Sequence, residues 1–147
     1  MKSARGYYAG LHLEASLARV LEGFSIRTTT VAVSELAVAP DLRIAAGSVY
    51  DPHVWMDVSL WRSAAQVVAD ALVAAVSAAN TDAGTDADCP AQIAARHAAY
   101  DALLADLHNW AVEAIGSIPD RQRVLVTAHD AFAYFGRAYG IEVEGIQ

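Results

Sequence analysis

The chain has 147 residues and a mass of 15.6 kDa, the length of one domain or of parts of two. Apolar residues make up 55% and charged residues 18%, so the composition supports a buried core and excludes intrinsic disorder. A formal net charge of -7 argues against non-specific nucleic-acid binding, which needs a basic surface. The single cysteine, Cys89, excludes an internal disulfide and any CxxC motif.

The first half of the chain predicts a helix, two extended segments and a second helix. Apolar residues recur at helical spacing over 13–24, and the β-branched run 28–33 predicts a buried strand. Residues 42–46 predict a short extended piece. A long helix then begins after Asp57, whose carboxylate can act as its N-cap.

Neither a membrane span nor a secretory signal is predicted. The most apolar stretch, residues 64–79, is interrupted by Gln66, Asp70 and Ser77, whereas a span needs about 18 uninterrupted apolar residues. The first eight residues contain no apolar core of a signal peptide and no small-residue cleavage site.

The second half of the chain predicts an α/β unit that follows one long helix. Residues Asn80–Cys89 are polar and predict a flexible surface loop, whose carboxylates Asp82, Asp86 and Asp88 form no specific ion site. Helical spacing then runs from Pro90 to Gly116, which would be about 40 Å long and is typical of a strut between lobes. A strand at 123–127, a helix and a strand at 141–146 follow, so the class is α/β with a parallel sheet.

Five histidines have the most obvious ligand chemistry. His97 and His108 lie inside the long predicted helix, where they can face outward, and we expect neither to bind metal. His12, His53 and His129 each lie at a junction between predicted elements, where the ligands of α/β sheets gather. Because imidazole nitrogen suits zinc, manganese, iron or copper, these three could form one metal site. Alternatively, each histidine caps a local element.

Other catalytic chemistry has little support. No GxSxG, GxxxxGK[ST] or HExxH motif occurs, which argues against a nucleophile elbow, a phosphate loop and a helix-borne metalloprotease site. A zinc hydrolase built on the three histidines would need a general base, and Glu14 and Asp130 are the adjacent candidates. Both also have local explanations, as an acid near a helix N-terminus and as a cap or imidazole-orienting partner.

Three blocks of sequence contain these junction histidines. They are Gly10-Leu11-His12-Leu13-Glu14, Asp51-Pro52-His53-Val54-Trp55-Met56-Asp57, and Val126 to Phe135 followed by Ala138-Tyr139-Gly140. In this order, the blocks resemble the bacterial metal-binding solute-binding proteins of ABC transporters, the zinc and manganese group that includes adhesin B-like lipoproteins. The chain departs from that pattern at Ala9, where asparagine is usual, and at Val58, where proline often follows Asp57.

The resemblance implies an α/β fold with two lobes, whose parallel sheets are joined by one long helix and enclose the metal. It assigns residues 1–89 to the remainder of the N-terminal lobe, 90–117 to the helix and 118–147 to the beginning of the C-terminal lobe. The fold is therefore expected to be incomplete at both ends. His12 and His53 are implied as ligands from the first lobe and His129 as the ligand from the second. The family's fourth ligand, usually Asp, has no counterpart here.

The implied function is an extracytoplasmic solute-binding subunit, periplasmic or lipid-anchored, that delivers zinc or manganese to a membrane permease. We expect it to be a monomer when full length, to bind no nucleic acid and to prefer zinc, which nitrogen ligands favour over manganese. The rival functions are a zinc-dependent hydrolase that uses the three histidines and a non-functional truncated remnant. Because missing strands would leave sheet edges and apolar faces exposed, we expect the isolated chain to be marginally stable or aggregation-prone.

Overall fold

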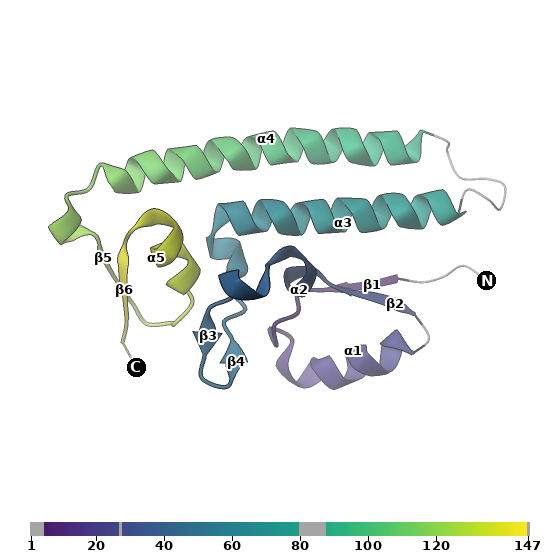
Figure 1. Ribbon diagram of the computed structural model, residues 1–147, viewed down its shortest axis with the longest axis horizontal. Helices are drawn as coiled ribbons and strands as arrows, with labels where there is room; N and C mark the ends of the chain where they lie inside the picture. Colours follow the sequence, from purple (N-terminus) through teal and green to yellow (C-terminus); the bar gives the residue numbers. More distant parts are fainter. Residues whose placement is uncertain (1–4, 27, 80–87, 147) are drawn as a thin grey trace.

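The fold begins with two parallel strands connected through a helix. The structure is a computed structural model that describes residues 5–26, 28–79 and 88–146 (Figure 1). Strand β1 (Arg5–Tyr8) pairs with β2 (Thr29–Ala32), with Tyr7 opposite Val31. A short 3-10 turn (Ala15–Leu17) and α1 (Ala18–Ser25) connect them. The sequence did not predict β1.

The strand predicted at 28–33 ends earlier than its β-branched composition indicates. Helix α2 (Val33–Ala37) begins immediately after β2, and the backbone N–H of Ser34 donates to the carbonyl of Ala9 at 2.8 Å. This long-range bond ties the start of α2 to the segment that follows β1. The pattern of neighbouring residues carries no information about such a long-range bond. The turn from β2 into α2 was therefore not predicted.

A small hairpin follows and leads into the first long helix. A 3-10 turn (Pro40–Leu42) precedes β3 (Ala45–Ala46), which pairs antiparallel with β4 (Val49–Tyr50). A further 3-10 turn (Val54–Met56) and Asp57 then precede α3 (Val58–Ala79). The Asp57 carboxylate accepts hydrogen bonds from the Ser59 amide at 2.9 Å and hydroxyl at 2.6 Å, which confirms the predicted N-cap.

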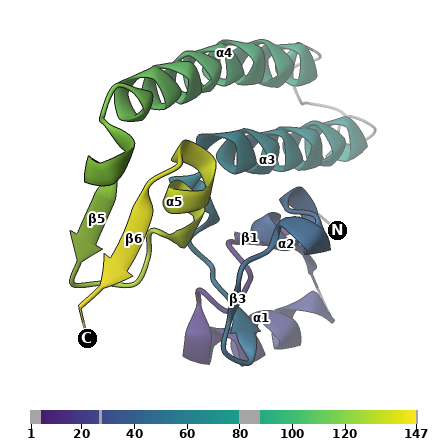
Figure 2. The ribbon, with the colours of Figure 1, turned by 60° about the vertical axis from the view of Figure 1, so that its left-hand side comes forward.

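Helices α3 and α4 (Cys89–Gly116) lie side by side (Figures 1 and 2). Arg62 of α3 donates to both carboxylate oxygens of Asp101 of α4, at 2.7 and 2.8 Å, and this hydrogen bond holds the pKa of Asp101 below its ordinary value. The long helix is confirmed, but it begins at Cys89, so the predicted loop was wrong at that residue. Residues 80–87 of that loop, with Asp82 and Asp86, lie outside the described residues.

By length and composition alone, α3 is apolar enough to cross a membrane, and it is the one helix among the described residues that passes this test. One such helix is a weak indication, because core helices of globular proteins pass the same test. In the structure, α3 packs against α2 and along α4.

The chain ends in the predicted strand–helix–strand unit. Strand β5 (Val124–Thr127) pairs parallel with β6 (Glu142–Gly145), and α5 (Ala133–Tyr139) connects them (Figure 2). Gly140 ends α5 with a left-handed φ of 67°, a conformation that glycine adopts without steric cost. The predicted α/β class, with parallel strand pairs and one long helix, is therefore confirmed.

The described core is small and joins distant parts of the chain. Its fully packed members are Leu11, Val38, Val54, Leu60 and Tyr134. Tyr134 comes from α5 and is completely buried against residues from the first 60 positions. The last helix is thereby fixed to the loops that precede α3.

Several predicted apolar faces are not covered. The apolar face of the helix predicted at 13–24 is open, with Leu17 and Phe24 each 58% exposed. On α4, Leu103 is 67% and Trp110 65% exposed. The amphipathic spacing predicted the helices correctly, but whether such a face is covered depends on elements distant in sequence.

The isolated 147-residue chain is expected to be marginally stable and to self-associate, because these apolar side chains face solvent. Analytical ultracentrifugation combined with a thermal melt would measure both properties. A monodisperse monomer that unfolds in one cooperative transition would contradict this expectation.

Candidate metal centre

His53 lies in a rigid loop, and a buried carboxylate fixes its ring. Asp51 is only 6% exposed, and its Oδ1 accepts from the His53 backbone N–H at 2.9 Å and lies 2.6 Å from the ring Nδ1. Because an ionised carboxylate only accepts hydrogen bonds, this contact assigns the proton to Nδ1. The Nε2 lone pair is then free to bind an electrophile, in the arrangement typical of metal-ligating histidines.

His129 comes from the far end of the chain and lies against His53. The two ring centroids are 5.2 Å apart with an interplanar angle of 82°. His129 follows β5 in a turn held by Thr127, whose hydroxyl donates to the His129 carbonyl at 2.9 Å and accepts from its amide at 3.2 Å. The end of β5 thus brings a second imidazole to the one that Asp51 orients.

His12 lies in a strained loop directly after β1. Gly10, Leu11 and His12 have φ values of 83°, 51° and 64°, a left-handed conformation that non-glycine residues rarely adopt. The Glu14 carboxylate helps to hold this loop, because it accepts from the backbone N–H groups of Ala9 at 2.6 Å and Gly10 at 3.2 Å. Glu35 accepts from the Leu11 amide at 3.2 Å.

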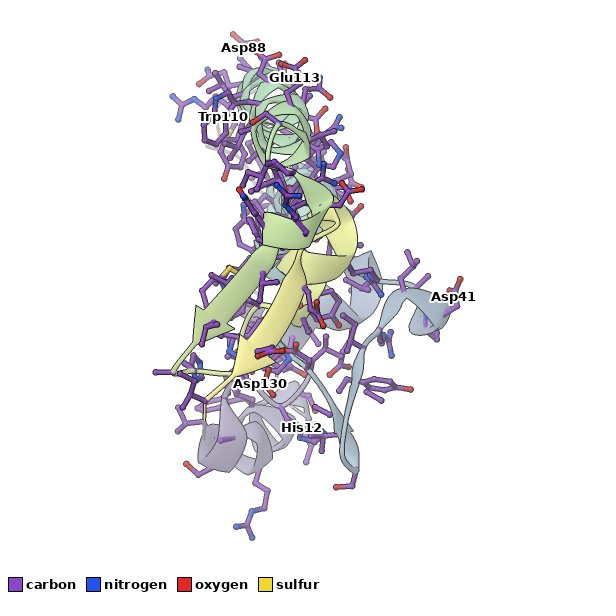
Figure 3. All side chains as sticks on the ribbon, turned by 90° about the vertical axis from the view of Figure 1, so that its left-hand side faces the viewer. His12, Asp41, Asp88, Trp110, Glu113 and Asp130 are labelled. Carbon is purple, nitrogen blue, oxygen red and sulfur yellow. The ribbon has the colours of Figure 1, made fainter. Side chains whose placement is uncertain are left out.

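The three predicted ligands are only partly brought together. His12 is exposed, and Figure 3 places it at the same end of the molecule as Asp130, opposite the end with Asp88 and Glu113. Within residues 5–26, 28–79 and 88–146, no three His, Cys, Asp or Glu side chains form a group that could hold a metal ion. The contact between predicted ligands that the structure contains is therefore the one between the rings of His53 and His129.

The two histidines of α4 are less exposed than their place in a long helix would allow. Both are half-buried. His97 has a buried Nε2 without a hydrogen-bond partner in the part of the chain that the structure describes. The Nδ1 of His108 lies 3.4 Å from the hydroxyl of Tyr139, whose pKa is raised by burial.

Sequence reasoning missed the residues that support His53. Asp51 appeared only as the first residue of a sequence block, although an aspartate two residues before a histidine, across a proline, is a readable signal for an orienting carboxylate. Tyr134 gave no such signal, because its partner Asp51 is 83 residues away. Its hydroxyl donates to the Asp51 carbonyl at 3.1 Å, and burial raises the pKa of Tyr134, which keeps that hydroxyl protonated.

Known proteins are similar to this chain in both sequence and fold. It is 36% identical over 140 residues to the zinc-binding protein TroA of Treponema pallidum (strain Nichols). It is 37% identical over 144 residues to the manganese-binding lipoprotein MntA of Bacillus subtilis (strain 168). Each match covers 95% of this chain.

Solved structures agree with this relationship. The periplasmic zinc-binding protein TroA from Treponema pallidum superposes with a TM-score of 0.85 at 35% identity, over 97% of this chain and 48% of the other. Fe(III)-bound YtgA from Chlamydia trachomatis gives a TM-score of 0.76 at 27% identity, over 90% and 44%. These neighbours are two-lobed proteins.

The chain spans about two-fifths of the length of the curated relatives that it matches, namely 42% of TroA and 43% of MntA. Within that span the agreement is nearly continuous. Residues 4–147 match the family model described as zinc-uptake complex component A, periplasmic. The chain therefore belongs to the ZnuA family of metal-binding proteins.

Proposed function

We propose that this chain is part of an extracytoplasmic solute-binding subunit of an ABC importer. The subunit binds a divalent transition metal, zinc or manganese, as its cargo and delivers it to a permease in the membrane. The observation that carries the proposal is the Asp51–His53–His129 arrangement, in which an oriented imidazole contacts a second one from the far end of the chain. Family membership and the zinc- and manganese-binding relatives support it.

The proposed ligands are His12, His53 and His129, and the metal lies between two lobes. Residues 1–89 belong to the first lobe, 90–117 to the helix between the lobes and 118–147 to the second lobe. Three imidazoles form a donor set that suits zinc. His12 is exposed in the loop after β1, so the proposal requires its side chain to turn toward the His53–His129 pair.

An enzymatic role is not proposed. The relatives are named as metal-binding proteins rather than as hydrolases. Of the two candidate bases, Glu14 is engaged by the amides of Ala9 and Gly10, which leaves it serving the loop rather than a water molecule. The location outside the cytoplasmic membrane, periplasmic or lipid-anchored, belongs to the same proposal and is supported by the names of the relatives. The proposal also takes the full-length protein to be a monomer.

The full-length protein is expected to bind zinc more tightly than manganese, because for nitrogen ligands the affinity of divalent metals rises from manganese towards copper, with zinc well above manganese. A competition titration with both ions at neutral pH, against a chelator of known affinity, measures the preference. Manganese that displaces zinc at equal concentrations would overturn the preference while leaving the transport proposal in place. A protein that binds neither ion would overturn the proposal itself and favour a non-functional remnant.

A further inference from the structure

The hairpin before His53 contains an unusual rung. Its ladder pairs Ala45 with Tyr50 and Ala46 with Val49, so the next opposed pair is Ile44 and Asp51. A hydrogen-bonded antiparallel pair exchanges two N–H···O bonds. Here only one of them is present, from the Asp51 amide to the Ile44 carbonyl at 2.9 Å.

The hydroxyl of Tyr134 occupies the place of the second bond. It accepts a hydrogen bond from the Ile44 amide at 3.0 Å and donates one to the Asp51 carbonyl at 3.1 Å. The two backbone groups that would otherwise bond to each other are therefore bridged by a side chain from α5. Tyr134 is 0% exposed, so water is not available as a substitute partner.

A second residue of α5 fixes the ring that carries this hydroxyl. The Arg137 guanidinium lies 5.1 Å from the centroid of the Tyr134 ring. Its Nη1 donates to the carbonyl of Leu42 at 2.7 Å, just before the hairpin. The contacts of Tyr134 and Arg137 place α5 against the hairpin at three backbone positions.

We propose that Tyr134 is a positioning residue for the candidate metal centre, because it sets the backbone of Asp51 and thereby the carboxylate that orients His53. This inference rests on the proposed metal-binding function. His129 lies five residues before Tyr134. One segment therefore supplies the candidate ligand His129 and also the hydroxyl that positions the other candidate ligand, His53. The distance between the His53 and His129 rings therefore depends on how closely α5 packs against the hairpin.

The bridged backbone pair of Ile44 and Asp51 predicts what happens when the Tyr134 hydroxyl is removed. In a Tyr134→Phe protein, the Ile44 amide and Asp51 carbonyl either remain buried without partners or close on each other. The first outcome destabilises the hairpin, and the second draws Asp51 towards Ile44. Both displace the carboxylate that lies 2.6 Å from the His53 Nδ1.

The test compares Tyr134→Phe with Tyr139→Phe in the full-length native protein. Tyr139 is the matched control, because it is a buried tyrosine of the same helix whose hydroxyl accepts from the Val58 amide at 3.3 Å rather than contacting the hairpin or Asp51. We expect Tyr134→Phe to weaken zinc binding about tenfold, the lower end of the loss caused by removing an orienting partner. We expect Tyr139→Phe to leave zinc affinity within twofold of wild type.

An NMR measurement on the metal-free protein separates positioning from a general loss of stability. We expect the short contact to Asp51 to give the His53 Nδ1 proton a downfield resonance. This resonance should shift or disappear in Tyr134→Phe and persist in Tyr139→Phe. A zinc affinity of Tyr134→Phe within twofold of wild type, or a His53 resonance that Tyr134→Phe leaves unchanged, would overturn the inference. Should Tyr134→Phe not fold, Arg137→Met, which releases the tyrosine ring, is expected to move the same resonance, and an unchanged resonance would overturn the inference.

The two proposals fail in different ways. A wild-type protein that binds no metal overturns the proposed function, and the His53 resonance then still decides whether Tyr134 positions the loop. A wild-type protein that binds zinc through His53, with an affinity that Tyr134→Phe does not change, overturns the positioning role alone.

Discussion

Replacement of His53 with alanine is expected to weaken zinc binding by the full-length protein at least about ten- to a hundredfold. Loss of a ligand should cost no less than loss of its orienting partner, for which that range is typical. His53 is the candidate ligand whose ring is both oriented by a buried carboxylate and in contact with a second imidazole. Isothermal titration of the metal-free protein with zinc, with a competing chelator for the wild type, gives the ratio of affinities.

His97→Ala is the control for this experiment, and it is expected to leave zinc affinity unchanged. His97 lies on α4 and is half-buried like His53, so its substitution removes a histidine of similar exposure. Its buried Nε2 has no hydrogen-bond partner among the described residues, so truncation removes an unsatisfied polar atom. Equal losses of affinity in the two variants would remove the assignment of His53 as a ligand.

Replacement of Gly136 with alanine is expected to destabilise the protein by about 1–3 kcal/mol, the usual cost of overpacking. A Cβ at this position would lie 2.8 Å from the Ile141 carbonyl oxygen and 2.8 Å from a Val143 methyl group. The first of these atoms is backbone, so the clash cannot be relieved by a side-chain rotation. Helix α5 would have to move away from β6, together with the docking contacts of Tyr134.

Gly23→Ala tests the same substitution without a clash, because a Cβ there meets no atom within 4 Å. Gly23 lies within α1, where alanine is favoured over glycine by roughly 0.5–1 kcal/mol, so stability should rise by about that amount. Urea unfolding in the presence of a metal chelator measures the midpoint urea concentration of each variant and of wild type. A Gly136→Ala midpoint at or above that of wild type would show that α5 does not pack against β6 as described.

The sequence by itself determined the elements whose signals are local. Periodic apolar residues identified α3 and α4, and the N-cap at Asp57 was readable from residue type. The strand–helix–strand order after Pro119 identified the parallel β5–β6 pair. These signals extend over one or two helical turns or one strand, which is the range of capping bonds and side-chain periodicity. Family resemblance then identified His12, His53 and His129 as candidate ligands.

Only the tertiary structure decided which of these signals act together. It placed His129 against His53, left His12 exposed, and inserted Tyr134 between Ile44 and Asp51. It also left the apolar face of α1 open, which the spacing of that face could not decide. Each outcome depends on a contact between residues far apart in the chain, or on the lack of one among the described residues. Such contacts leave no periodic trace in either partner's local sequence, because burial and hydrogen bonding are properties of the pair.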